Sequence, residues 1–411
     1  RLDGLAIGFS GPTIRKVLGV SVVTVMASAL VMNLVVSGML LEDTGFLGAA
    51  SVRETALVAS ASVIAAAALI ALAPPIVRVV AATVAGVLAT TFVLLTVVVS
   101  GNVVSAGMGL ATVASCLGIG LVGLSGLKLP VEPHARATVA AGLGFAVLTW
   151  IVRAIGRIGL VNPWLLGAPV AVGGAFVCAW GCRRVWSQRR DLAPRIVGYL
   201  ARPAPALAAI CCAAAVGLIA IWTAAPEVQY DALSAKEWLP ALWAREGHIF
   251  IPQETPQMFV TGSALDAFLP GHTVGGAATG RYTAFFLGVV LCVLVRRLVR
   301  PWVSRGSAAI LSAVFLATPH LLWQMSTAFD DLELALAALA LAALAVGLQP
   351  SGVLDGVLMG ILVGSAVNAK LHLAVFAGVV ACVWLLRVHG KRRGLHVLAG
   401  AVAGAFGTGG T

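Results

Sequence analysis

The chain has 411 residues, of which 60% are hydrophobic and 10% are charged, and its formal net charge is +11. Soluble domains carry about 25% charged residues. A chain this apolar cannot cover itself with polar surface, so it needs a lipid bilayer as its solvent. The many apolar residues exclude an intrinsically disordered chain. The sequence has no basic patch with interleaved aromatic residues, which argues against nucleic acid as a partner.

Uncharged apolar runs recur along the whole chain. A helix needs about 20 apolar residues to cross ~30 Å of hydrocarbon. Runs near or above this length occupy residues 17–41, 55–77, 79–99, 103–127, 158–182, 203–224, 306–329 and 334–354. Shorter runs occupy residues 137–152, 282–295, 356–369, 371–386 and 394–411. We therefore predict an all-α polytopic integral membrane protein with 12 or 13 transmembrane helices.

The charges on the connecting segments select one orientation in the membrane. With a cytoplasmic N-terminus, alternation of the helices places 20 of the 27 Lys and Arg residues inside, in agreement with the positive-inside rule. The same orientation places 12 of the 16 Asp and Glu residues outside. The basic segment RRVWSQRRDLAPR (183–195) is then the strongest cytoplasmic anchor.

The distribution of charge also predicts that the chain divides into two regions. Residues 1–127 hold four helices with short connections and no buried charge, which indicates a transmembrane extension that serves as a scaffold. Residues 128–411 form the core and include one large outer segment, 225–281. The chain begins with Arg1, and its tail GAFGTGGT stops within or just after an apolar run. We therefore expect a piece of a longer protein with an incomplete C-terminus.

The outer segment contains the polar stretch YDALSAKEWLPALWAREGHI, residues 230–249. Its pattern predicts a short amphipathic helix over 231–246, with Pro240 as its one unfavourable member. Trp238 and Trp243 flank the apolar face of this helix, and we expect both to anchor it at the membrane interface.

Ionisable residues on the predicted outer side form the candidate site. They are Asp231, the pair Asp330 and Asp331, Lys370 and Arg281. Cations hold phosphate groups, and a carboxylate can take the proton of an attacking hydroxyl. The set therefore fits an anionic lipid substrate. The structural alternatives are a solvated charge at Asp231, a helix cap at Asp330 or Asp331, and a lysine that reaches the interface at Lys370.

The order of these motifs resembles the GT-C superfamily of polytopic glycosyltransferases, in the bacterial branch related to protein mannosyltransferases and lipid A sugar transferases. That branch has a Y/W-D-A-L-x-Y-H-L-x-x-P motif followed by a Trp-rich turn and G-R-I. The residues here that match it without a gap are Tyr230, Asp231, Ala232, Leu233, Pro240, Gly247 and Ile249. Pro256-Gln257 is similar to the family's later P-Q, and Arg281 matches a basic residue before the next helix. STAFDDLELA and GILVGSAVNAKLHLAVF resemble the second acidic loop and a lysine-bearing helix.

The resemblance implies an enzyme that moves a sugar from a polyprenyl-phosphate donor to an acceptor hydroxyl of a glycan, lipid or protein. The reaction would take place on the extracytoplasmic face of a bacterial cytoplasmic (inner) membrane. Asp231 would be the general base of an inverting displacement, and Lys370 and Arg281 would neutralise the leaving phosphate. Asp330 or Asp331 would orient the acceptor or, if a divalent cation is the cofactor, help to hold it. Tyr230, Lys236 and Gln257 are expected to contact the substrate.

Two other functions stay open at this point. A transporter or flippase of a lipid-linked or anionic substrate would place its charges near mid-membrane on discontinuous helices. A non-catalytic scaffold subunit with a GT-C-like fold is the second alternative. It is suggested by Ala235-Lys236, which replace an aromatic-His pair of the family motif, and by Val260, which replaces an acidic residue.

Overall fold

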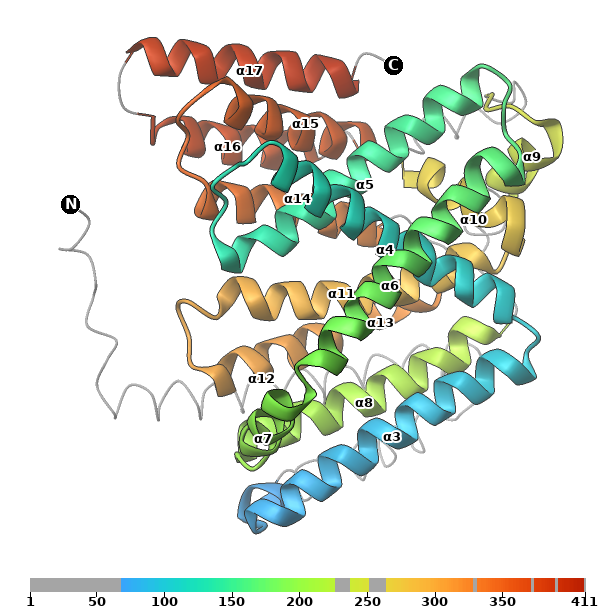
Figure 1. Ribbon diagram of the computed structural model, residues 1–411, viewed down its shortest axis with the longest axis vertical. Helices are drawn as coiled ribbons and strands as arrows, with labels where there is room; N and C mark the ends of the chain where they lie inside the picture. Colours follow the sequence, from blue (N-terminus) through green and yellow to red (C-terminus); the bar gives the residue numbers. More distant parts are fainter. Residues whose placement is uncertain are drawn as a thin grey trace, which may run out of the picture. The chain divides into compact units, whose positions relative to one another are not determined.

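The computed structural model describes residues 68–225, 237–250, 264–327, 331–370, 373–388 and 391–409. Within these ranges every regular element is a helix and no strand is present (Figure 1). Together with the apolar composition, this confirms the prediction of an all-α polytopic membrane protein.

The helices follow one another with short connections. In chain order they are α3 (Pro75–Val99), α4 (Val103–Gly126), α5 (Pro133–Arg157), the π-helix η1 (Pro163–Gly167), α6 (Ala168–Ser187), α7 (Arg189–Leu200), α8 (Pro203–Ala224), α9 (Trp238–Glu246), α10 (Ala264–Gly275), α11 (Thr279–Val299), α12 (Arg305–Leu316), α13 (Pro319–Ser326), α14 (Asp331–Gly347), α15 (Val353–Ala369), α16 (Leu373–Leu385) and α17 (Lys391–Gly409).

Six helices of the described ranges are long and apolar enough to cross a membrane: α3, α4, α5, η1 with α6, α8 and α11. The number becomes seven if α12 and α13, which meet at a break, form one span. Helices α15 and α16 are apolar but shorter. The total of 12 or 13 spans includes runs before residue 68 and stays a prediction for the whole chain.

Proline decides where several of these helices begin. Pro133 and Pro203 occupy the first positions of α5 and α8, where a missing N–H breaks no intrahelical hydrogen bond. Pro319 begins α13, and α12 stops at Leu316 because the residue before a proline is pushed out of the α region. The apolar run expected over 306–329 is therefore two helices, not one.

The large outer segment contains more structure than its sequence predicts. Its described residues form α9 and α10, and α9 begins at Trp238. Pro240 is tolerated because it lies in the first turn, whose N–H groups have no intrahelical acceptor. The prediction that Trp243 anchors the membrane interface is wrong, since this side chain is buried and its Nε1 donates to the Phe250 carbonyl at 2.7 Å.

The chain divides into two compact units. The first contains residues 1–91, 190–217 and 299–322, and the second contains residues 92–189, 218–298 and 323–411. In the described part of the first unit, Ala208 of α8 packs against Ala309 and Ala313 of α12. The Tyr199 hydroxyl of α7 donates to the Arg305 carbonyl at 3.4 Å. The division predicted at residue 127 stays a prediction.

Small residues let the helices of the second unit approach closely. A Cβ added at Gly120 of α4 would lie 1.7 Å from the Ala140 carbonyl oxygen of α5. A Cβ added at Gly144 of α5 would lie 1.6 Å from the Cys116 carbonyl oxygen of α4. The two backbones therefore touch, as in other membrane helix pairs that meet through small residues. Helix α14 packs against α5, and their apolar side chains form the main buried cluster of this unit.

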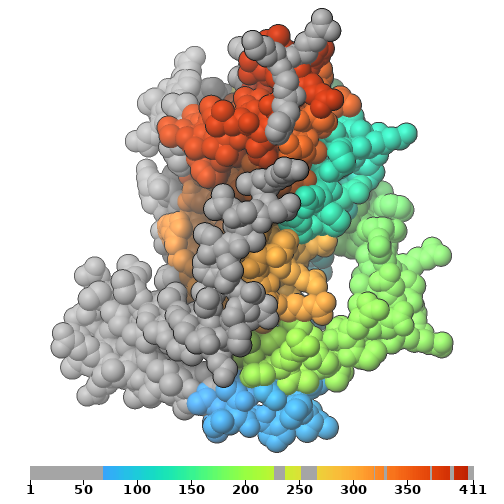
Figure 2. Space-filling view, turned by 90° about the vertical axis from the view of Figure 1, so that its left-hand side faces the viewer, coloured from blue at the N-terminus to red at the C-terminus, as the bar shows by residue number. Residues whose placement is uncertain are grey.

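Helices α15 and α17 form a second close pair, visible in orange and red in Figures 1 and 2. Each contains a G-x-x-x-G pattern, at Gly356 and Gly360 in α15 and at Gly400 and Gly404 in α17. A Cβ at any of these glycines would lie within 2.4 Å of a carbonyl oxygen of the other helix. Gly356 lies against the Val397 carbonyl group, and Gly360, one turn later, lies against the Ala401 carbonyl group. The contacts thus move toward the C-terminus in both helices, so α15 and α17 run parallel.

Candidate functional site

Lys370 and Asp331 meet where two helices end. Helix α15 stops at Ala369, and Lys370 is extended, with φ −155° and ψ 132°. Its Nζ contacts Oδ1 of Asp331, the first residue of α14, at 2.5 Å. A cation at a helix C-terminus and an anion at a helix N-terminus each have a favourable interaction with the helix dipole. The predicted break of the apolar run at Lys370 is confirmed.

Gln324 of α13 contacts the second carboxylate oxygen of Asp331. Its Nε2 donates to Asp331 Oδ2 at 2.7 Å, and the side chain is buried. Both carboxylate oxygens of Asp331 are thus engaged, one by a cation and one by an amide. Sequence reasoning missed Gln324, although an amide within the apolar run 306–329 was the available signal.

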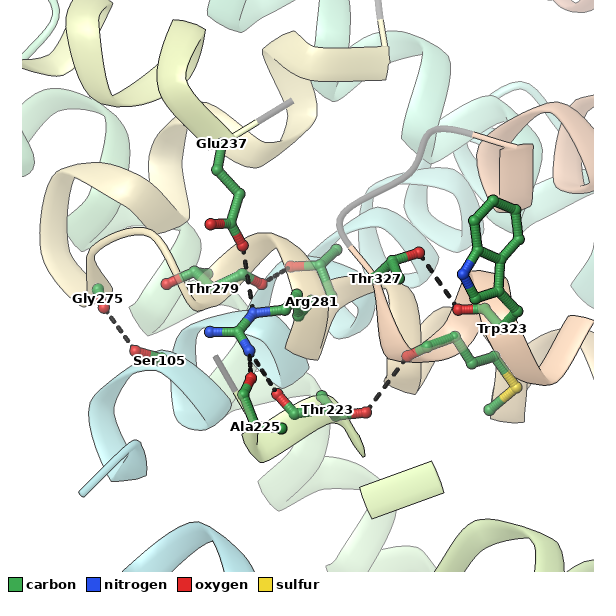
Figure 3. A network of polar contacts seen from close by, with 11 residues as sticks. Ser105, Thr223, Ala225, Glu237, Gly275, Thr279, Arg281, Trp323 and Thr327 are labelled. Carbon is green, nitrogen blue, oxygen red and sulfur yellow. Dashed lines mark hydrogen bonds and ion pairs between the residues drawn. The ribbon is translucent and has the colours of Figure 1, made fainter. Parts of the chain in front are cut away.

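Arg281 lies in the first turn of α11 and is buried. Its Nη1 donates to the carbonyl oxygens of Thr223, at 3.2 Å, and of Ala225 (Figure 3). Its Nε lies 3.2 Å from Oε1 of Glu237, and both side chains of this ion pair are less than 10% exposed. The guanidinium therefore satisfies carbonyl groups at the C-terminal end of α8 that lack an intrahelical partner. Sequence reasoning did not identify Glu237 as its partner.

The two residues that Arg281 joins are separated by one segment of the chain. Ala225 is the last described residue before positions 226–236, and Glu237 is the first described residue after them. The predicted site residues Tyr230, Asp231 and Lys236 belong to this segment and lie outside the described ranges, as do Gln257 and Asp330. Both ends of the segment that carries Asp231 are thus fixed to one guanidinium.

Thr223 connects the two ion pairs. Its hydroxyl donates to the Ile219 carbonyl at 2.9 Å and to the Met325 carbonyl at 3.4 Å. Met325 directly follows Gln324, which holds Asp331. Polar contacts, together with the peptide bond between Gln324 and Met325, therefore link Arg281 to Lys370, and part of this connection is drawn in Figure 3. Of the predicted site residues, Asp331 and Lys370 lie in contact. That these residues and Asp231 line one outward cavity stays a prediction.

A further ion pair joins α5 to α10. Arg153 Nε lies 2.7 Å from Asp266 Oδ2, and the carboxylate is buried. Burial raises the pKa of Asp266 to about 6, although the positive charges of Arg153 and Arg157 act in the opposite direction. Sequence reasoning missed this pair, for which the signal was the isolated Arg153 directly after the apolar run 137–152.

His272 lies in the same helix as Asp266. It is buried, and neither ring nitrogen has a hydrogen-bond partner among the residues that the structure places. Burial lowers the pKa of His272 to about 4, because the protonated ring would have to be taken out of water. The ring is therefore neutral at physiological pH.

Buried acids in this unit are not confined to these pairs. Glu333, which the charge pattern assigned to the outer aqueous side, is fully buried in α14. Among the residues with described positions, no group of three or more His, Cys, Asp or Glu side chains could bind a metal ion. Comparison with known proteins gave no match to a family model, to a curated protein or to a solved structure.

Proposed function

We propose that the chain is a membrane glycosyltransferase that transfers a sugar from a polyprenyl-phosphate donor to an acceptor hydroxyl. One observation carries the proposal. A lysine–aspartate pair lies at a break between apolar helices. Polar contacts and the backbone of Gln324 and Met325 link this pair to the arginine that contacts the residues at both ends of the Asp231 segment. This links a cation for a lipid phosphate to the segment that carries the candidate base.

Lys370 is the better placed of the two candidate cations for the phosphate. Its side chain is 22% exposed, so its ammonium can exchange the Asp331 carboxylate for a phosphate oxygen. Arg281 is more deeply buried and donates to two carbonyl groups and to Glu237. We therefore assign Arg281 a positioning role, which differs from the phosphate contact expected from sequence.

The reaction follows from these roles. The acceptor hydroxyl oxygen attacks the anomeric carbon of the donor sugar, and the bond from that carbon to the phosphate oxygen breaks. The proton of the hydroxyl passes to the Asp231 carboxylate, and polyprenyl phosphate leaves beside Lys370. Lys370 and Gln324 each contact one carboxylate oxygen of Asp331 in the structure. The reaction as written assigns no step to a divalent cation.

The test is transfer of a radiolabelled hexose from a panel of polyprenyl-phosphate donors in proteoliposomes. Asp231→Asn should lower transfer by about 10²–10⁴-fold, the usual contribution of a general base, and leave donor binding unchanged. Lys370→Met should weaken donor binding first. Asp191→Asn and Lys128→Met remove charges from exposed positions of the same types and serve as matched controls. Full transfer by Asp231→Asn would exclude the base role, and no transfer by the intact protein would favour a scaffold.

A transporter is the second candidate, because the break at Lys370 produces two short apolar helices in place of one span. Discontinuous helices with a charge at the break are a recurrent design of transporter sites. In the same proteoliposomes a transporter would move the intact donor across the bilayer without cleaving its sugar–phosphate bond. An enzyme would release polyprenyl phosphate on the side where it is added.

A further inference from the structure

A groove with a volume of about 1240 Å³ lies among α4, α5, α6 and the end of α11. Most of its wall is apolar, with Leu117, Leu121 and Val122 on one side and Phe176 and Trp180 on the other. Trp180 is half exposed and Phe176 is 71% exposed, so the wall is open to a molecule that approaches from the bilayer. In Figure 2 the surface is hollowed between the green of α6 and the gold of α11.

Three arginines line the groove at one end. Arg136 lies in the first turn of α5, Arg184 in the last turn of α6 and Arg297 in the last turn of α11. The described residues that line the groove include no acidic side chain. The groove is therefore apolar along its length and positive at one end. It complements an anionic lipid, which has apolar acyl chains and a negative headgroup.

Two of these cations are held in position by neighbours that also line the groove. Arg136 Nη2 donates to the Ser125 hydroxyl at 2.9 Å. The Arg184 guanidinium lies 5.5 Å from the ring centroid of Trp180, a cation–π contact. Neither contact neutralises the charge, so both guanidinium groups can still donate to a phosphate.

This groove is separate from the candidate active site. Arg281 lies in the first turn of α11 and Arg297 in the last, which places them about 24 Å apart along the helix at 1.5 Å per residue. The arginine end faces the membrane side on which the helices carry their basic residues. A basic pocket between transmembrane helices on that side is a recognised site for anionic headgroups.

We propose that this groove binds an anionic glycerophospholipid of the surrounding leaflet. The phosphate lies among Arg136, Arg184 and Arg297, and an acyl chain runs along Val122 and Phe176. A zwitterionic lipid of the same chain length would make the same apolar contacts, but the positive amine of its headgroup would oppose the arginines. The charge of the headgroup therefore decides which lipid occupies the groove.

Quenching of Trp180 fluorescence by brominated lipids tests this proposal in reconstituted full chains. The contribution of Trp180 is the difference between the intact protein and Trp180→Phe. At equal mole fractions, brominated phosphatidylglycerol should compete for the groove roughly tenfold better than brominated phosphatidylcholine, given the attraction per basic residue near a charged bilayer. The preference should weaken as salt is added.

A matched pair of double variants separates a built site from a generally basic surface. Arg184→Gln with Arg297→Gln removes two groove cations, whereas Arg183→Gln with Arg296→Gln removes their sequence neighbours, which do not line the groove. The first variant should lose most of the preference and the second should keep it. Equal losses in the two variants, equal quenching by the two lipids, or no quenching of Trp180 by either lipid would each overturn the proposal. Thermal unfolding of both variants checks that they fold.

Discussion

Arg281 is the residue on which most contacts of the candidate site converge, and its burial makes it sensitive to substitution. Arg281→Met should lower the free energy of unfolding by about 3–5 kcal/mol, because the Glu237 carboxylate would remain buried without its partner. Combining it with Glu237→Gln should recover part of the loss. Thermal unfolding in detergent would measure both variants. If Arg281→Met unfolds at the temperature of the intact protein, the ion pair is not buried as the structure has it.

His272 should make the protein sensitive to acid. Its folded-state pKa of about 4 is below the ordinary 6.5, so the unfolded chain binds more protons between these values. Stability contributed by neutral His272 is therefore complete above pH 6.5 and is lost as the pH falls through that window, by at most roughly 3 kcal/mol. We expect His272→Phe to lose less stability than the intact protein between pH 6.5 and pH 4, as measured by thermal unfolding at each pH.

Asp266 should act in the opposite direction over nearly the same window. Its folded-state pKa is raised from 3.8 to about 6, so here the folded protein binds more protons and gains stability as the pH falls. Asp266→Asn removes this compensation and should make the loss of stability in acid steeper. Changes of the same sign in Asp266→Asn and His272→Phe would contradict the assignment of the two groups.

At the residue scale, the sequence identified two side chains that meet in the structure but missed several of the residues that contact the candidates. Lys370 and Asp331 were candidates because each is an ionisable residue beside an apolar run, and the structure pairs them. Glu237, Gln324 and Arg153 were missed. Asp266 lies 113 residues from Arg153, and Arg281 lies 44 residues from Glu237. Asp331 lies only seven residues from Gln324, but on a different helix. A local pattern assigns a residue to a helix or a face but does not identify its contact in another element.

At the scale of elements, the packing of α15 on α17 depends on glycine. Gly400→Ala would place a Cβ 2.2 Å from the Val353 carbonyl oxygen, whereas the space around Gly394 in the same helix is open. We expect Gly400→Ala to lower stability by about 1–3 kcal/mol. Gly394→Ala should be neutral or slightly stabilising, because alanine favours the helix. Equal melting temperatures for the two variants would show that α17 does not pack closely against α15 at Gly400.

The elements themselves were predicted unevenly. Uncharged runs identified most helices, and the charge at Lys370 identified a break. The break before Pro319 and the formation of α10 were missed. The break was missed because the helices were predicted from the length and hydropathy of uncharged runs, and a proline such as Pro319 changes neither. Helix α10 forms in a segment read as a loop, and its Ala267, Phe268 and Leu269 are completely buried by neighbouring helices. That burial is a tertiary effect which outweighs local propensity.

At the scale of the whole molecule, the orientation predicted from the Lys and Arg residues of the connecting segments stays a prediction that can be tested directly. The connection between α3 and α4 should then be extracytoplasmic and the end of α6 cytoplasmic. A membrane-impermeant thiol reagent should label Ser100→Cys in intact cells and label Ser187→Cys only after lysis, in a background without the native cysteines. Labelling of Ser187→Cys in intact cells would reverse the orientation and with it the proposed function.

The composition alone determined the class of the molecule, because a chain with 10% charged residues has too little polar surface for water. It did not determine how the helices group. Helix α4, predicted to belong to an N-terminal extension, packs its backbone against α5. Hydropathy shows only that both helices are apolar. The close approach of their backbones depends on Gly120 and Gly144, which leave space for the partner helix.

The contact of Arg281 with both Ala225 and Glu237 has a thermodynamic side. Ala225 and Glu237 are separated by 11 residues, and for a flexible chain of that length the length-dependent part of the closure entropy is roughly 2 kcal/mol. This cost depends only logarithmically on length, so doubling the number of residues between the two anchors would add only about 0.6 kcal/mol. The length-dependent cost therefore sets only a weak limit on the number of residues between Ala225 and Glu237.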